Sequence, residues 1–249
     1  MEPILSLRHI GLDYHSPDGE VQALSDVTFS VQPGEFVSIV GPSGCGKSTL
    51  LSIIAGLLPP SRGAVHIAPG IRLGYMLQKD HLLEWRTIFR NACLGLEITK
   101  NLTEETKKEV QILMEKYGLQ DFAQKKPAQL SGGMRQRVAL IRTLALKPDV
   151  LLLDEPFSAL DYQTRLSVAD GVTGIIRSEK KTALLVTHDI SEAIASSDRV
   201  VVLSRRPAHV KSIYEIDLGL TEKTPFGARE SAGFHHYFNQ IWKDLDRNE

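Results

Sequence analysis

Two short glycine-containing segments have the composition of phosphate-binding sites. The first, GPSGCGKST at residues 41–49, fits the pattern G-x-x-x-x-G-K-[ST]. In such a loop the glycines let backbone N–H groups surround a phosphate, the lysine supplies positive charge, and the serine hydroxyl can bind Mg²⁺. The second, LSGGMRQR at residues 130–137, places a serine and two glycines at the start of a helix, which also presents N–H groups to an anion.

The first segment, called the phosphate loop below, has the context that its motif requires. A run of apolar residues at 36–40 predicts a strand before it, and a helical pattern follows from Lys47. Cys45 is expected to fill space inside the loop, with no nucleophilic role. The sequence therefore predicts nucleotide binding, with these residues around the phosphates: Gly41, Pro42, Ser43, Gly44, Cys45, Gly46, Lys47, Ser48 and Thr49.

An acidic pair ends another apolar run. VLLLD at 150–154 reads as a buried strand, so Asp154 and Glu155 would lie at its carboxyl end. Beside a phosphate loop, Asp154 can bind Mg²⁺, and Glu155 can orient or deprotonate the attacking water, a role worth about 10²–10⁴-fold in rate. The alternative is an exposed acidic pair without a role, but its combination with the phosphate loop favours the catalytic interpretation.

The elements that must position these residues alternate between strands and helices, which predicts an α/β fold with a P-loop core. Apolar runs predict strands at 4–7, 27–31, 36–40, 150–154, 183–187 and 199–203. Helical patterns cover 47–58, 103–117 and a stretch that begins after Gly133 and runs to about residue 146.

Three parts of the chain differ in character. We expect an ATPase-type domain over residues 1–220, a helical insertion within it at about 80–145, and a short tail at 221–249. The tail is rich in aromatic and histidine residues, which are expected to pack: Phe226, Phe234, His235, His236, Tyr237, Phe238 and Trp242. His235 and His236 are adjacent, and adjacent residues on a helix do not share a face, so packing is preferred over a metal site.

Composition narrows the class of partner and the location. The 29 basic and 30 acidic residues leave a net charge of −1. This balance gives no indication of a basic surface that would bind nucleic acid. Cys45 and Cys93 do not make a disulfide framework, which fits a reducing compartment. The longest apolar run, LLSIIAGLLPP, is far shorter than the roughly 20 residues of a membrane span. We expect a cytoplasmic protein that acts on membranes only through another protein.

Over about residues 4–215 the chain resembles the nucleotide-binding subunit of an ABC transporter. The family's motifs occur in its order: Tyr14 as the aromatic that stacks on adenine, residues 41–49 as Walker A, Gln78 as the Q-loop glutamine, 130–136 as the signature, 151–155 as Walker B, 158–161 with Asp161 as the D-loop, and His188 as the switch histidine. Met134 departs from the glutamine of many relatives. That affects no role assigned here, because Ser131 and the backbone make the contact.

The resemblance implies why one chain has two phosphate-facing segments. In this family two subunits dimerise head to tail, so Ser131, Gly132 and Gly133 of one subunit cover the ATP on the other's Walker A loop. The implied fold is an ABC-type ATPase domain with an antiparallel β subdomain and a helical subdomain. Gln78 would contact Mg²⁺ or the attacking water, and His188 would contact the γ-phosphate.

Longer segments resemble the nitrate, sulfonate and taurine importers: 77–97, 154–165 and 187–210. That resemblance implies membrane-embedded permease subunits as partners on the inner face of the membrane, and indirectly a solute-binding protein. A permease helix would dock beside Leu83, Trp85 and Arg86, although Trp85 could instead be buried in the helical insertion. The permease and binding protein select the solute, so this sequence leaves it open.

Three other functions are weighed against import. A soluble ABC-type ATPase of DNA repair, chromosome structure or translation usually has a coiled-coil insertion or two nucleotide-binding modules, and neither is present. A P-loop kinase would leave the signature and His188 without a role. A scaffold that does not hydrolyse ATP is disfavoured because Lys47, Asp154 and Glu155 are all present.

Overall fold

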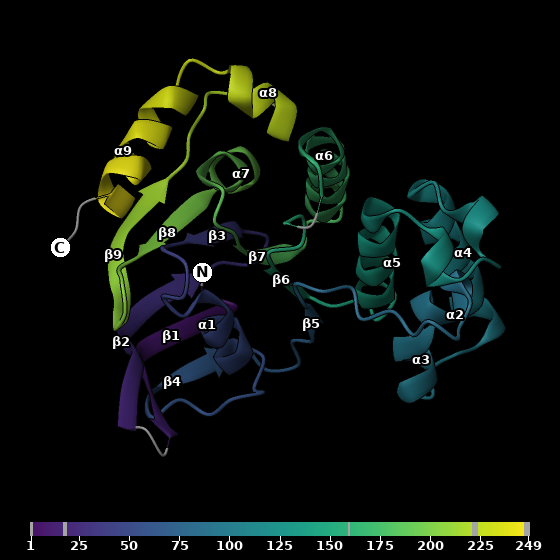
Figure 1. Ribbon diagram of the computed structural model, residues 1–249, viewed down its shortest axis with the longest axis horizontal. Coiled ribbons are helices and arrows are strands. Elements are labelled where there is room, and N and C mark those ends of the chain that lie inside the picture. Colours follow the sequence, from purple (N-terminus) through teal and green to yellow (C-terminus); the bar gives the residue numbers. More distant parts are fainter. Residues whose placement is uncertain (1, 17–18, 159, 221–223, 247–249) are drawn as a thin grey trace.

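The computed structural model describes residues 2–16, 19–158, 160–220 and 224–246. Residue 159, inside the D-loop segment, and the expected tail boundary at 221 lie outside the described residues. Figure 1 shows a larger body built round a sheet, from which helices α2 to α5 project as a separate group.

Nine strands of the described chain form one sheet, in the order β4-β1-β2-β9-β8-β3-β7-β6-β5. Their bounds are β1 Leu5–Ser16, β2 Gly19–Val31, β3 Phe36–Val40, β4 Arg62–Ile67, β5 Leu73–Met76, β6 Val150–Asp154, β7 Thr182–Val186, β8 Arg199–Leu203 and β9 Ala208–Glu215. β1 pairs antiparallel with β2 and β4, whereas β5, β6, β7, β3 and β8 run parallel. β9 joins the two halves, because it runs parallel to β2 and antiparallel to β8.

The parallel strands are covered on both faces. Every residue of β3, β6 and β7 is buried, as their continuous apolar sequences predict. In β6, Leu151 and Leu153 belong to the core shared with α5 and α6, whereas Val150 and Leu152 belong to the core shared with α1 and the antiparallel strands. The sheet is therefore held rigidly between two apolar layers.

The α-helices of the described residues are α1 Lys47–Ile54, α2 Ile88–Ala92, α3 Leu94–Ile98, α4 Glu104–Lys116, α5 Gly132–Leu144, α6 Tyr162–Ser178, α7 Ile190–Ser196, α8 Pro225–Glu230 and α9 Phe234–Asp246. The prediction for α4 is confirmed, with Thr103 as its N-cap and Gly118 just past its end at φ +66°. The prediction that α1 continues to residue 58 was wrong. Gly56 takes φ +73° and Leu57 is 69% exposed, so the chain leaves the helix before the prolines.

The tail packs against the main body as two helices. Ala228, Phe234 and Ile241 are buried in one core with α7 and β8. Asp244 fixes α9 to β9, because its carboxylate accepts hydrogen bonds from the hydroxyls of Ser212 (2.5 Å) and Tyr214 (2.6 Å). The expectation that all the tail aromatics pack was partly wrong. Phe226, His235 and His236 are exposed, because each helix buries only one face. Trp242 is 55% exposed, yet its ring stacks on that of Phe238 with the centroids 6.1 Å apart.

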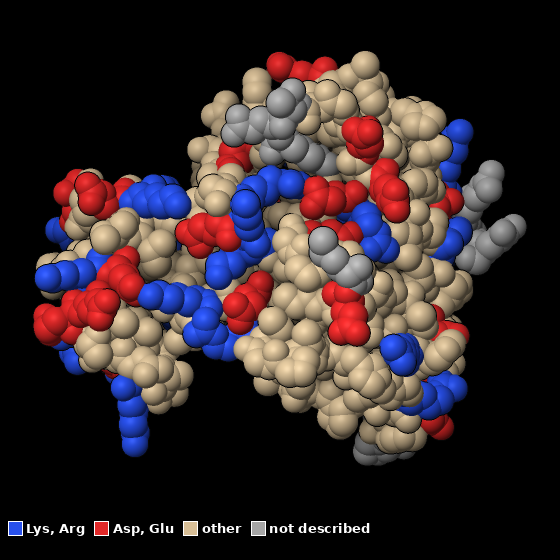
Figure 2. Space-filling view, turned by 180° about the vertical axis from the view of Figure 1, so that it is seen from behind, with Lys and Arg blue, Asp and Glu red and all other residues tan. Residues whose placement is uncertain are grey.

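Charges on the surface are mixed. Figure 2 shows basic and acidic side chains interspersed over the visible face. Within the described residues, no helix has both the length and the apolar composition to cross a membrane.

Candidate nucleotide-binding site

The phosphate loop joins β3 to α1. Lys47 is buried, and its ammonium group donates to the carbonyl oxygens of Gly41 (2.8 Å) and Pro42 (3.0 Å), which curls the loop round the lysine. Gly46 takes φ +116°, and a Cβ there would lie 2.9 Å from a methyl group of Leu24, so only glycine fits. No side chain caps α1, so its first N–H groups are directed to an anion such as a phosphate.

Other residues around the loop support its shape. Cys45 is buried, and burial raises the pKa of its thiol, in keeping with the space-filling role. Tyr14 of β1 is 43% exposed, and its hydroxyl lies 3.2 Å from that of Thr49. The guanidinium of Arg206 donates to the carbonyl of Gly44 (2.7 Å), a contact that sequence reasoning missed because 162 residues separate the partners.

Ser48 and Asp154 meet at the start of α1. The Ser48 hydroxyl donates to Oδ1 of Asp154 (2.9 Å), and the hydroxyl of Tyr75 donates to Oδ2 (3.4 Å). Burial raises the pKa of Asp154, so a nearby cation would offset the cost of its charge. A hydroxyl and a carboxylate are hard oxygen donors of the kind that Mg²⁺ prefers, so these residues fit a Mg²⁺ site.

Glu155 lies between Gln78 and His188. Its carboxylate accepts a hydrogen bond from Nε2 of Gln78 (3.2 Å) and lies 3.2 Å from Nδ1 of His188. The three residues follow β6, β5 and β7, which are neighbouring parallel strands, so their carboxyl ends meet at one edge. Gln78 reaches Glu155 here rather than Ser48 or Asp154. A carboxylate held in this way can orient a water molecule and take its proton.

The signature segment lies at the start of α5. Ser131 accepts a hydrogen bond from the backbone N–H of Met134 (3.4 Å), as predicted for a helix cap. Ser131 and Gly132 are exposed, whereas Gly133 is buried. Figure 1 shows α5 separated from α1 by β5 and β6. The exposed start of α5 is therefore remote from this chain's own phosphate loop and accessible to another molecule.

The D-loop residue Asp161 caps α6, where its carboxylate accepts from the backbone N–H of Thr164 (3.1 Å). Gly133 packs against this same turn, since a Cβ on it would lie 2.8 Å from a methyl group of Thr164. The signature segment and the start of α6 are therefore neighbours.

Ion pairs that the sequence did not reveal fix the segment after Gln78 to α5. Arg135 donates to the carboxylates of Asp80 (2.8 Å) and Glu84 (2.9 Å). Arg142 donates to the carbonyl oxygens of Asp80 (2.7 Å) and His81 (3.0 Å). No periodic pattern signals contacts between residues this far apart, and the two arginines read as an ordinary polar helix face.

The three candidates for permease docking lie beyond these ion pairs. Trp85 is 73% exposed, so the alternative that it is buried in the helical insertion was wrong. Leu83 is partly exposed, and Arg86 forms an ion pair with Glu97 of α3. The Trp85 side chain is therefore accessible to another molecule.

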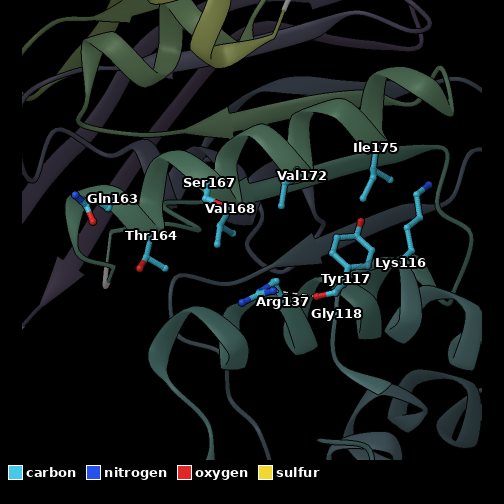
Figure 3. A pocket seen from close by; sticks show the side chains of 11 residues that line it. Lys116, Tyr117, Gly118, Arg137, Gln163, Thr164, Ser167, Val168, Val172 and Ile175 are labelled. Carbon is cyan, nitrogen blue, oxygen red and sulfur yellow. Dashed lines mark hydrogen bonds between the residues drawn. The ribbon is translucent and has the colours of Figure 1, made fainter. Parts of the chain in front are cut away.

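A cleft of about 620 Å³ lies between α6, the end of α4 and the middle of α5 (Figure 3). Tyr117 and Arg137 form one wall, and Val168 and Val172 of α6 form the other. None of its lining residues belongs to the phosphate loop, so this cleft is distinct from the phosphate site.

Comparison with known proteins agrees with this geometry. The family model described as ABC transporter matches residues 24–158. YtlC of Bacillus subtilis, an uncharacterised ABC transporter ATP-binding protein, is 47% identical over 98% of this chain and 96% of its own length. The taurine import ATP-binding protein TauB of Jannaschia sp. is 39% identical over 85% and 82% of the two chains. A dimeric bacterial ABC transporter cassette matches with TM-score 0.74 and 31% identity, covering 86% of this chain and 99% of its own.

Proposed function

This chain belongs to the ATP-binding proteins of the ABC transporter family, which are ATPases, and we propose that it powers the import of a small solute such as taurine, another sulfonate or nitrate. The observation that carries the proposal is the meeting of the phosphate loop, Asp154, Glu155 and His188 at one sheet edge. The exposed start of α5 is a second phosphate-facing segment. Because it is remote from this chain's own phosphate loop, it complements a site on another subunit.

The nucleotide is held by the phosphate loop. Tyr14 stacks on the adenine, the loop N–H groups and Lys47 bind the β- and γ-phosphates, and Thr49 lies beside them. Ser48 and Asp154 hold Mg²⁺, with Gln78 as a further candidate ligand. When bound, the ion offsets the negative charge that develops on the phosphates.

Hydrolysis uses the residues at the end of β6. Glu155 accepts the proton of the attacking water, and Gln78 holds the glutamate from one side. His188, on the other side, contacts the γ-phosphate. Because Glu155 touches both neighbours, a change at either one alters the position of the base.

Transport follows from dimer closure. Ser131, Gly132, Gly133 and Asp161 of one subunit cover the ATP on the other, and ATP drives closure because it binds the closed state more tightly. The residues around Trp85 transmit this motion to the permease at the inner face of the membrane, where a solute-binding protein delivers the solute from outside. In this proposal residues 1–220 form the ATPase domain, 80–145 its helical insertion and 221–249 the tail.

The test is the molar mass of the Glu155→Gln protein by light scattering, with and without Mg²⁺-ATP. We expect a monomer that becomes a dimer only with ATP, since slow hydrolysis preserves the closed state. Adding Ser131→Arg should abolish the dimer. Thr103→Arg is the matched control, because Thr103 is also an exposed helix cap, on α4, and its loss should leave the dimer intact.

A Glu155→Gln protein that binds ATP yet stays monomeric would show that closure depends on the permease. One result would contradict the proposal. A protein that transfers phosphate to a small molecule is a kinase and not a transport ATPase.

A further inference from the structure

A buried polar cluster lies behind His188. Thr187 and Asp189 flank the histidine, and these three residues are called the His188 loop below. The Thr187 hydroxyl donates to the Glu192 carboxylate of α7 and accepts from the backbone N–H of Asp189 (3.0 Å). Asp189 caps α7, accepting from the N–H groups of Ser191 (2.8 Å) and Glu192 (3.2 Å). The His188 loop is thus held to α7 on both sides of the histidine.

Arg165 of α6 reaches the same loop from the other direction. Its guanidinium lies 3.8 Å from the Asp189 carboxylate and donates to the carbonyl of Leu160 (3.1 Å). Leu160 directly precedes Asp161, the cap of α6. Arg165 therefore connects the His188 loop to the D-loop, the segment that faces the second subunit in the proposed dimer.

Two atoms of this cluster are buried without a hydrogen-bond partner: Oε1 of Glu192 and Nε of Arg165. Both residues line one small cavity together with Glu155 and His188, and this cavity has no room for a water molecule. A buried N–H and a buried carboxylate oxygen that both lack partners are costly, and each is the chemical complement of the other. A direct hydrogen bond between the two would satisfy both atoms.

We propose that Arg165 and Glu192 are positioning residues for His188, and that Nε–H of Arg165 donates to Oε1 of Glu192 when the dimer closes on ATP. The inference rests on the proposed function. It adds a route by which closure of the dimer at the D-loop changes the position of His188. Neither residue touches the nucleotide. Both act by fixing the His188 loop between α6 and α7.

The charge of Glu192 supports this role. Burial raises the pKa of the Glu192 carboxyl group to about 7. The hydrogen bond from Thr187 opposes this rise, and the nearby negative charge of Asp189 increases it. Arg165 of α6 and Arg229 of α8 favour the charged form. Glu155 and His188, which line the same cavity, are the other ionisable groups near it. A direct bond from Arg165 would favour the carboxylate further, so the contact should be stronger above pH 7 than below it.

The test is a double-mutant cycle on ATP hydrolysis with Arg165→Gln, Glu192→Gln and both together. We expect each single change to lower kcat about tenfold with little change in KM for ATP, and the double change to cost no more than one of them. The wild-type kcat should also rise as the pH increases through about 7, and Glu192→Gln should remove this rise.

Arg177→Gln is the matched control. Arg177 lies on the same helix and its Nε is also buried without a partner. It donates to the carbonyl oxygen of Ser196 (2.8 Å) and to Asp198 (2.9 Å), at the opposite end of α7 from the His188 loop. The Arg177→Gln change should lower the free energy of unfolding as Arg165→Gln does, but it should leave kcat unchanged. Additive losses in the cycle, an equal loss of kcat in the control, or full activity of Glu192→Gln would each overturn the proposal.

A second measurement is independent of turnover. NMR of the His188 imidazole in the ATP-bound Glu155→Gln protein should give signals whose dependence on pH changes when Glu192→Gln is added, because the carboxylate behind the His188 loop is then lost. A signal that is the same in both proteins would refute the role of Glu192. If the wild-type protein does not hydrolyse ATP at all, the proposed function fails instead, so the two failures are distinguishable.

Discussion

Replacing Glu192 by glutamine should change how the stability of the protein depends on pH. Burial raises the pKa of this carboxyl group from 4.5 to about 7, so the folded state binds its proton more tightly than the unfolded state does. Stability is therefore lost as pH rises from about 4.5 to about 7, and the loss is complete above pH 7. This rise in the pKa of Glu192 corresponds to about 3 kcal/mol in the free energy of unfolding, because one pKa unit equals about 1.4 kcal/mol.

The assay is urea unfolding of both proteins at pH 5 and pH 8 without nucleotide. The difference in unfolding free energy, variant minus wild type, should increase by about 2–3 kcal/mol from pH 5 to pH 8. Taking the difference removes the other titrating groups, which are common to both proteins. A difference that is constant, or that decreases with pH, would show that Glu192 is not destabilised by burial.

Three further predictions concern the nucleotide site and its support. Gly63 and Gly70 have almost equal positive φ values (+80° and +78°), but a Cβ would overlap backbone carbonyl oxygens of β1 only at Gly63. Gly70→Ala should therefore cost about 1 kcal/mol and Gly63→Ala at least about 2 kcal/mol more in urea unfolding; equal costs would contradict this. Tyr14→Ala should weaken ATP binding about tenfold in a fluorescence titration, and unchanged affinity would exclude stacking. Asp154→Asn should remove the Mg²⁺ dependence of ATP binding measured by calorimetry, and a dependence equal to wild type would place the ion elsewhere.

Features set by neighbouring residues could be predicted from the sequence. The bounds of α4 follow from Thr103 at its start and Gly118 past its end, and the strand that carries Asp154 follows from its continuous apolar run. The phosphate loop is also local, because its lysine, serine and glycines act within nine consecutive residues. In each case the pattern and the contacts span the same short stretch of chain.

Contacts between distant segments could not be predicted. Arg165 and Glu192 read as polar positions on two separate helices, and nothing in their spacing indicates one cavity. The pairing of Arg135 with Asp80 likewise depends on how α5 packs against the segment after Gln78. These features arise only when the sheet brings its helices together.

The strand before the phosphate loop has a consequence for biosynthesis. β3 pairs with β7 and β8, so its partners, Thr182–Val186 and Arg199–Leu203, come from the last third of the chain. A chain growing on the ribosome has the complete loop sequence early, yet it has no sheet to hold the loop until these strands have emerged. A truncated or stalled chain therefore carries the ATP-binding sequence without the means to bind ATP, which keeps unfinished copies from consuming it.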